Sequence, residues 1–399
     1  MKATDKQHGL VPESYETYQV VNEGNIIIRG TDLQNDHTSL RIGLSRNRGI
    51  ISSAYLCLQA LPSITPDYGY QILNVFDLTK AIYRYGSGLR QNLDHGEIKR
   101  LSIFLPPLDE QAAIVRFLDH ANRKIDGFIR AKRKLIGLLN EQKQAIIHRA
   151  VTRGLHPDVP LKPAGIPWLG DIPAHWDVLR AKYVFREMDE RSKTGNEEQL
   201  SVSHITGVTP RSQKNITMFK AESYVGHKIL RPGDLAVNTM WAWMAALGVS
   251  KHEGIISPAY AVYRQRKPER LLSDFADHLL RIAPYKLNYL SRSTGLRPSR
   301  LRLYPDEFFK IQIIIPSKDE QQHIVDSIAV ETAALTTAIA RTEREIALMQ
   351  EYRTRLTADL VTGKLDVREA AAKLPEVEEQ PSADPMMPED EMDPEPENE

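Results

Sequence analysis

Apolar residues recur at alternating three- and four-residue steps in two long segments of the chain that contain no proline. A mean period near 3.5 residues is typical of a helix that presents one apolar seam to a partner helix. The pattern therefore predicts two long helices, at residues 109–150 and 319–362. The seam positions that best define them are Leu118, Ile125, Ile129, Ile136 and Leu139 in the first segment, and Ile328, Leu335, Ile339, Ile346 and Met349 in the second.

Polar residues interrupt both seams at matching steps. They are Asn122, Lys132 and Lys143 in the first segment and Thr332, Thr342 and Arg353 in the second. Polar groups at seam positions fix register and pairing, so we expect the two helices to pack against each other. The alternative is that each helix packs only on its own globular domain. A helix of about 40 residues spans about 60 Å, which is long enough to hold two domains well apart.

The chain repeats itself about 205 to 210 residues downstream. Residues 49–55, GIISSAY, correspond to residues 254–260, GIISPAY, and residues 101–155 match at a constant offset of 210 without a gap. Each copy is far larger than the unit of a solenoid, so the repeat indicates a tandem duplication that gives two similar domains.

Short β-branched runs broken by glycine and proline precede each long helix, at about 10–105 and 164–315. Ile26–Ile28 and the run IQIII at residues 311–315 are examples, and such runs are typical of strands in a mixed domain. The predicted fold class is therefore α+β, with two mixed α/β domains and two long helices. The expected boundaries are 1–108 and 156–318 for the domains, 109–155 and 319–366 for the helices, and 367–399 for a disordered acidic tail.

The formal net charge of zero hides an uneven distribution. Residues 376–399 contain eleven acidic residues and no Lys or Arg, which leaves 52 basic against 41 acidic residues in the rest of the chain. A basic body suits a nucleic-acid partner, because neutralising phosphates releases counterions. The alternative is a solvated surface that happens to be rich in Lys and Arg.

The sequence points to the cytoplasm and offers little chemistry. A single cysteine, Cys57, excludes an intrachain disulfide and a thiolate zinc site, and no run of about 18 apolar residues or secretory signal is visible. The glycine-containing segments 86–91 and 362–365 lack residues that a phosphate-binding loop needs. We therefore predict a non-enzymatic chain that binds no metal and no cofactor of its own.

Side chains suited to DNA contacts gather in a few short segments. Arginine, lysine, glutamine and asparagine can reach base edges or phosphates, and tryptophan adds a flat apolar face. For the tryptophans the alternative is a place in the core, and for each arginine a solvated surface role. The candidates are Arg211, Gln213, Lys214 and Asn215; Asn238 and Trp241; Arg297, Arg300 and Arg302; and Arg41, Arg46, Arg48 and Arg90 in the first copy.

Three kinds of segment resemble the specificity subunits of type I restriction–modification systems. The sequence IPWLGDIPAHWDV at residues 166–178 is similar to the opening of a target recognition domain, and residues 254–260 are similar to a strand motif within it. LPPLDEQ at residues 105–111 and IPSKDEQ at residues 315–321 are similar to the junctions between recognition domain and long helix. The resemblance covers about residues 8–366.

This resemblance implies two target recognition domains and two spacer helices that pack as an antiparallel coiled coil. Each domain would read half of a bipartite sequence in double-stranded DNA, and the helices would set the distance between the halves. The implied partners are modification subunits, two in number, and restriction subunits. S-adenosylmethionine, ATP and Mg²⁺ would belong to those partners.

One departure from the family pattern affects the first copy. Residues 162–203 of the second copy have no counterpart before His8. We therefore expect the first recognition domain to be incomplete at its N-terminus. The competing functional hypothesis is a non-enzymatic coiled-coil scaffold whose basic domains bind proteins. A self-contained DNA methyltransferase or nuclease is a third and disfavoured possibility.

Overall fold

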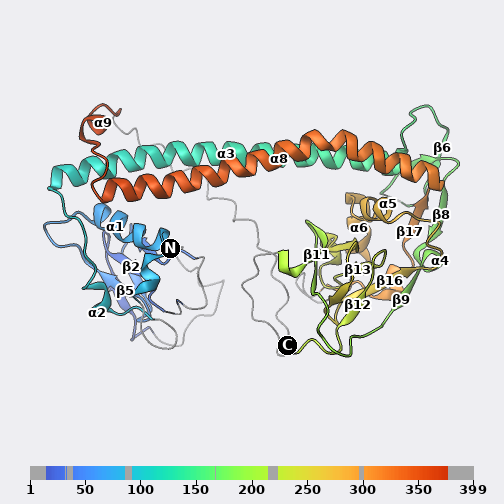
Figure 1. Cartoon of the computed structure of the whole chain (residues 1–399), viewed down its shortest axis with the longest axis horizontal. Coiled ribbons are helices and arrows are strands. Elements are labelled where there is room, and N and C mark those ends of the chain that lie inside the picture. The colour runs from blue at the N-terminus through green and yellow to red at the C-terminus, as the bar shows by residue number, and fades with distance from the viewer. Residues whose placement is uncertain are drawn as a thin grey trace. The chain divides into compact units, whose positions relative to one another are not determined.

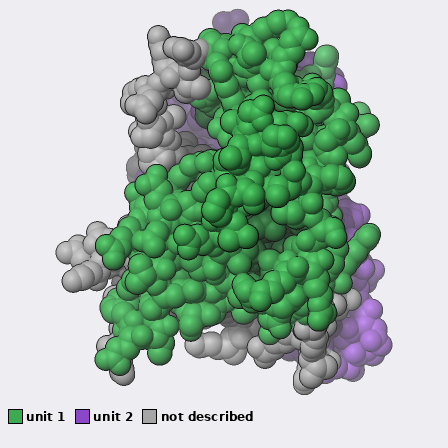
Figure 2. Space-filling model, turned by 90° about the vertical axis from the view of Figure 1, so that its left-hand side faces the viewer, with its two compact units in different colours: residues 1–135, 341–383 green, residues 136–340, 384–399 purple. Residues whose placement is uncertain are grey.

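The computed structural model describes residues 15–31, 33, 39–85, 92–166, 168–213, 223–295 and 301–375. The chain divides into two compact units, coloured separately in Figure 2. Unit 1 comprises residues 1–135 with 341–383, and unit 2 comprises residues 136–340 with 384–399. Each unit therefore contains one globular body and one half of each long helix.

Unit 1 contains a small antiparallel sheet with a helix against it (Figure 1). The sheet has the strand order β3-β2-β5, and β1 pairs separately with β4. Side chains alternate along β2, so Ile26 and Ile28 lie in one apolar cluster while Ile27 lies in another with Cys57. The elements are β1 (Gln19–Val21), β2 (Ile26–Ile28), β3 (Ile42–Leu44), β4 (Gly49–Ile51), β5 (Leu56–Leu58), α1 (Pro66–Leu78), η1 (Ala81–Arg84) and α2 (His95–Ile98).

Unit 2 contains a larger sheet with the order β14-β13-β16-β9, together with the antiparallel pairs β6–β7, β10–β11, β12–β15 and β8–β17. Its elements are β6 (Leu161–Pro163), β7 (Asp171–Pro173), β8 (Asp177–Arg180), α4 (Ala181–Val184), β9 (Phe185–Met188), β10 (Leu200–Ser203), β11 (Gly207–Pro210), η2 (Arg211–Gln213), β12 (Lys228–Leu230), β13 (Leu235–Val237), η3 (Ala242–Met244), β14 (Leu247–Val249), β15 (Gly254–Ile256), β16 (Ala261–Gln265), α5 (Ser273–Leu280), α6 (Ala283–Arg292), α7 (Pro305–Phe308) and β17 (Gln312–Ile315).

The two globular bodies repeat one topology. Strands β3, β2 and β5 of unit 1 correspond in sequence and pairing to β14, β13 and β16 of unit 2, and the pair β1–β4 corresponds to β12–β15. Helix α1 corresponds to α5, because α1 follows β5 and α5 follows the equivalent strand β16. The predicted fold class, two mixed α/β domains with two long helices, is confirmed.

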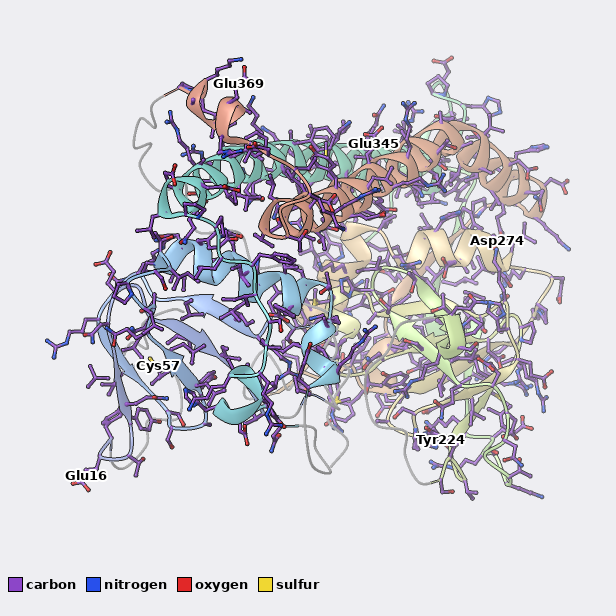
Figure 3. All side chains as sticks on the ribbon, turned by 60° about the vertical axis from the view of Figure 1, so that its left-hand side comes forward. Glu16, Cys57, Tyr224, Asp274, Glu345 and Glu369 are labelled. Carbon is purple, nitrogen blue, oxygen red and sulfur yellow. The ribbon has the colours of Figure 1, made fainter. Side chains whose placement is uncertain are left out.

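The long helices are α3 (Leu108–Arg153) and α8 (Lys318–Val361). Their halves pair in an antiparallel sense within each unit, because the partner's residue number falls as the residue number on α3 rises. In unit 1 Asp126 pairs with Arg353, and Lys132 lies 2.6 Å from Glu345, which Figure 3 labels. In unit 2 the Lys143 ammonium donates to the Thr336 hydroxyl at 3.0 Å, and Arg149 lies 3.3 Å from Glu331.

The named seam residues of both helices are all buried or half-buried. Polar residues at interruptions of the seam make contacts with the other helix, as Lys132, Lys143 and Arg353 show. Helix α8 also includes an 18-residue stretch with a mean hydropathy of 1.2, long and apolar enough in composition to cross a membrane. The pairing with α3 gives its apolar positions a partner. Leu118, Ile125, Ile129 and Ile328 are buried, and Ile136, Leu139, Leu335, Ile339, Ile346 and Met349 are half-buried.

One buried glutamine fixes the start of each long helix to its globular body. Gln321 accepts a hydrogen bond from the backbone N–H of Leu272 at 2.7 Å and donates to the carbonyls of Arg270 and Pro316 at 3.0 and 2.9 Å. Gln111 makes the equivalent bonds to Thr65, Ser63 and Pro106. The shared Asp-Glu-Gln sequence thus provides a clamp that sets where each helix leaves its domain.

Gln321→Ala is expected to destabilise unit 2 by about 2 kcal/mol, because it leaves buried backbone groups without partners. Gln322→Ala is the matched control, since Gln322 is exposed and bonds only to Asp326. Urea unfolding followed by circular dichroism measures both. Equal free energies of unfolding for the two variants would show that the clamp contributes nothing.

Candidate nucleic-acid interface

Two loops of unit 2 meet at one surface. The first follows β13 and includes η3, and the second joins α6 to α7. The backbone N–H of Leu303 donates to the carbonyl of Thr239 at 2.9 Å and links the loops. Thr294 and Arg302 exchange two backbone hydrogen bonds, at 3.0 and 2.9 Å, which close the base of the second loop. Side chains more than fifty residues apart in sequence are thereby brought together.

These loops present stacked aromatic rings beside a guanidinium. The rings of Trp241 and Trp243 stack with centroids 5.7 Å apart and planes 22° apart, and Trp243 Nε1 donates to the carbonyl of Met240 at 3.0 Å. Arg302 is exposed, and its Nη2 lies 3.7 Å from the sulfur of Met240. We call Met240, Trp241, Trp243 and Arg302 the Trp–Arg patch. A flat apolar face next to a bidentate cation suits contacts to bases, sugars and phosphates.

The segment at Arg211 is only partly available for a ligand. Arg211 is half-buried, and its Nη1 donates to Gln199 Oε1 at 3.4 Å, so part of the guanidinium is engaged within unit 2. Gln213 is exposed at the end of η2. Five of the predicted contacts lie outside the described residues: Lys214, Asn215, Arg297, Arg300 and Arg90.

Asn238 is an interior residue and not a surface contact. It is 4% exposed, and its Nδ2 donates to the Tyr260 hydroxyl at 3.1 Å. The expectation that it faces DNA is therefore not supported, because a side chain at the end of the central strand β13 points into the domain. Asn238 instead anchors the loop that carries the tryptophans.

Arg41 likewise holds the first domain together. It is 3% exposed, and its guanidinium donates to the Tyr83 hydroxyl at 3.1 Å and to the carbonyl of Thr31 at 2.7 Å. The expectation of a surface role is not supported for this residue. Arg46 is exposed and lies 2.9 Å from Asp67, and Arg48 is exposed between β3 and β4.

The loop pair of unit 2 has an equivalent in unit 1. The backbone N–H of Leu93 donates to the carbonyl of Gly30 at 2.7 Å, as Leu303 does to Thr239. Residues 32, 34–38 and 86–91 of the unit 1 loops lie outside the described residues. The duplication therefore places a loop junction at the same position of both folds, with different residues in each.

A polar cavity of about 360 Å³ lies elsewhere in unit 2, between α5 and α8. Its lining includes His278, Asp274, Asp277 and Lys251. Burial lowers the pKa of His278, and the carboxylates of Asp277 and Asp274 oppose that shift. Across the described residues, no group of three His, Cys, Asp or Glu side chains is arranged to hold a metal ion. The lowered pKa makes His278 a neutral side chain near pH 7.

Because the pKa of His278 is lower in the folded state than in the unfolded one, its contribution to stability is present above the ordinary value of 6.5 and is lost as the pH falls below it. His278→Gln is therefore expected to flatten the loss of thermal stability between neutral pH and about pH 5.5. Melting temperatures measured across this pH range test the effect. If the melting temperature of the variant fell with pH as steeply as that of the wild type, the prediction would be refuted.

From the sequence, the tryptophans of this segment are expected to be DNA contacts or core residues, but the candidates include only Trp241 and not Trp243 or Met240. Trp243 stood two residues from a named candidate, and its alternation with Trp241 was equally compatible with a core. The proximity of Met240 to Arg302 depends on the hydrogen bond between Thr239 and Leu303, which joins segments about 60 residues apart. No local signal reports such a contact.

No family model matches the chain. A putative type I restriction enzyme MjaX specificity subunit of Methanocaldococcus jannaschii is 22% identical over 315 residues, which cover 76% of this chain and 69% of that protein. A chain from a structural study of complex assembly and conformational transition in the type I R-M system aligns with a TM-score of 0.57 and 16% identity, over 88% of this chain and 85% of that one.

The crystal structure of the HsdS subunit from Thermoanaerobacter tengcongensis aligns over 88% of this chain and 84% of its own, with 16% identity and a TM-score of 0.36. The likeness in fold rests on the chain with the TM-score of 0.57. The likeness in sequence rests on the subunit of Methanocaldococcus jannaschii. The chain is thus similar in sequence to a putative type I specificity subunit and similar in fold to a chain of a type I R-M system.

Proposed function

We propose that the chain is the DNA-recognition subunit of a type I restriction–modification complex and works in the cytoplasm. Each unit would read one half of a bipartite target in double-stranded DNA, and the paired helices would set the spacing between the halves. Two modification subunits and the restriction subunits would dock on the chain. S-adenosylmethionine, ATP and Mg²⁺ would act in those partners, and the chain itself would have no catalytic role.

The observation that carries this proposal is the loop junction that recurs in both units. A duplicated domain that keeps its framework and changes its surface loops is suited to reading two different half-sites. In unit 2 that junction carries the Trp–Arg patch, whose chemistry fits a groove of DNA. The excess of basic residues outside the acidic C-terminal segment supports a polyanionic partner.

Binding to duplex DNA tests the proposal directly. Methylation-sensitive sequencing of the host genome supplies a candidate bipartite motif, and fluorescence anisotropy measures affinity for it over a range of salt concentrations. We expect tight binding that weakens steeply with salt and exceeds binding to a scrambled duplex. Salt-insensitive or absent binding would favour the protein-binding scaffold, and methyl transfer by the chain alone would refute the non-catalytic assignment.

A further inference from the structure

Two strands that complete the domain in unit 2 have no paired equivalent among the described residues of unit 1. In unit 2 the strand β16 lies between β13 and β9, whereas its equivalent β5 pairs with β2 alone and forms an edge. Strand β17 pairs with β8, whereas its equivalent, residues 102–105, forms no strand. Strands β8 and β9 belong to one continuous segment, residues 177–188.

The same comparison shows an apolar surface without cover. Ile313, Ile314 and Ile315 of β17 are 0%, 0% and 4% exposed. Their equivalents at the offset of 210 residues are Ile103, Phe104 and Leu105, which are 44%, 63% and 50% exposed. An apolar run next to an open strand edge is a template for pairing with another chain.

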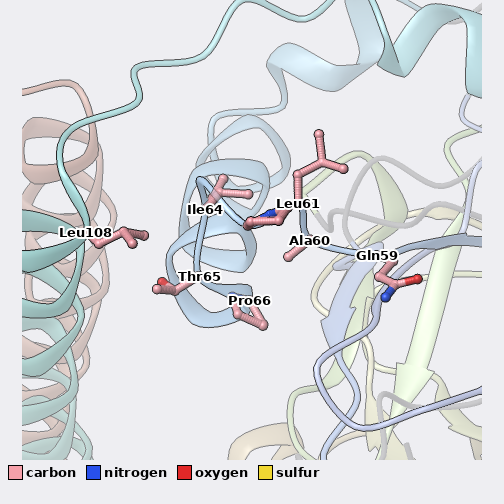
Figure 4. Close-up of a pocket in the computed structure, with 8 residues that line it drawn as sticks. Gln59, Ala60, Leu61, Ile64, Thr65, Pro66 and Leu108 are labelled. Atoms are coloured by element: carbon pink, nitrogen blue, oxygen red, sulfur yellow. The ribbon is translucent and has the colours of Figure 1, made fainter.

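A cavity of about 610 Å³ lies beside this edge, and Figure 4 shows its lining. Gln59, Ala60 and Leu61 form part of it. Their equivalents in unit 2, residues 264–266, hold the segment between β8 and β9: Gln265 lies opposite Phe185 in the sheet, and the N–H of Arg266 donates to the carbonyl of Val184 at 2.8 Å. The cavity is therefore lined by residues whose counterparts in unit 2 pair with Phe185 and bond to Val184.

A pair of equivalent glycines extends the comparison to the neighbouring strands. A Cβ on Gly254 would lie 2.2 Å from the carbonyl oxygen of Glu198, so only glycine fits that close approach. A Cβ on Gly49 would meet nothing within 4 Å. Gly49 would therefore allow a neighbouring backbone to approach closely, but no described residue of unit 1 does so.

We infer that unit 1 binds a separate polypeptide that adds these two strands along β5 and residues 102–105. The partner would carry two short strands joined by one helical turn, with apolar side chains at the positions of Val184 and Phe185. This mode of binding is strand addition, in which main-chain hydrogen bonds give affinity and pockets select side chains. The surface is distinct from the loop junction that we propose for DNA.

A second copy of the chain is a poorer occupant. Its own segment is already built into unit 2, where Phe185 is 0% exposed and Val184 is 4% exposed. Donating that segment would expose both side chains and open two strand pairings. A free polypeptide of the same chemistry pays no such cost, which favours a partner other than the chain itself.

Cys57, the only cysteine of the chain, allows a test of register in the intact protein. It lies on β5 (Figure 3), and its equivalent Val262 lies opposite Met188 on β9. The probe is a synthetic peptide of residues 174–200 with Met188→Cys, activated as its mixed disulfide with thionitrobenzoate. Attack by the Cys57 thiolate forms the protein–peptide disulfide and releases the thionitrobenzoate anion, which is followed by its absorbance. Opposed residues of paired strands lie within disulfide reach.

The matched control peptide carries Glu187→Cys, whose side chain would point to the opposite face of the strand. We expect the Met188→Cys peptide to react faster by about tenfold or more, as held reactants do. Phe104→Asp in the protein should abolish the difference, while Leu348→Asp, an exposed leucine on α8, should not. Equal rates for the two peptides would overturn the proposal, as would a Cys57–Cys57 dimer formed in preference to the peptide adduct.

Discussion

Ile328→Asp is expected to destabilise unit 2 by about 4 kcal/mol, the largest effect of any single change considered for the helix pair. Ile328 is 2% exposed and belongs to the core that joins α8 to the globular body. The substitution removes apolar packing and places a carboxylate in a buried apolar cluster, where it is poorly solvated. Urea unfolding monitored by circular dichroism gives the free energy.

Val330→Asp is the matched control for this prediction. Val330 lies two residues away on the same helix but is 78% exposed, so its change should stay within about 0.5 kcal/mol. Ile129→Asp is expected to act on unit 1 as Ile328→Asp acts on unit 2, since Ile129 is 6% exposed. Equal free energies of unfolding for Ile328→Asp and Val330→Asp would show that burial at Ile328 contributes nothing to stability.

The architecture could be predicted from the sequence because its signals are local or repeated. The steps between apolar residues indicated α3 and α8 to within a few residues of their ends, and the duplication indicated two similar domains. The order of strands was a different matter. The position of β9 beside β16 depends on contacts between segments about 75 residues apart, which no short pattern encodes.

The candidate site was predictable only in part, and the reason is burial. Arg41 and Asn238 have the side chains of DNA contacts, but each meets a tyrosine hydroxyl that a distant segment brings to it. A polar side chain that finds such partners can be buried at little cost. Composition alone does not distinguish Arg41, which is buried, from Arg302, which is exposed. The difference depends on where each residue lies in the fold.

Arg302→Ala is expected to weaken DNA binding by about fivefold or more if its guanidinium reads a base, because such a contact contributes about 1–3 kcal/mol. A phosphate contact and a base contact differ in their signature. Loss of a phosphate contact lowers affinity for all sequences and reduces the slope of log affinity against log salt by about 1. Loss of a base contact relaxes specificity at one position of one half-site. Anisotropy titrations with the cognate duplex and its single-position variants separate them.

Trp241→Ala should also reduce affinity for DNA, because its ring would make an apolar contact with a sugar or a thymine methyl. That contact involves no charge, so the slope of log affinity against log salt should stay unchanged. Trp168→Ala and Lys267→Ala are the matched controls, because both residues are exposed in unit 2 outside the loop junction. Their affinities should equal that of the unchanged chain.

Because Trp241 and Arg302 lie in one patch beside Met240, the double variant should bind less tightly than either single variant. Unchanged affinity in the double variant would remove the Trp–Arg patch from the DNA interface.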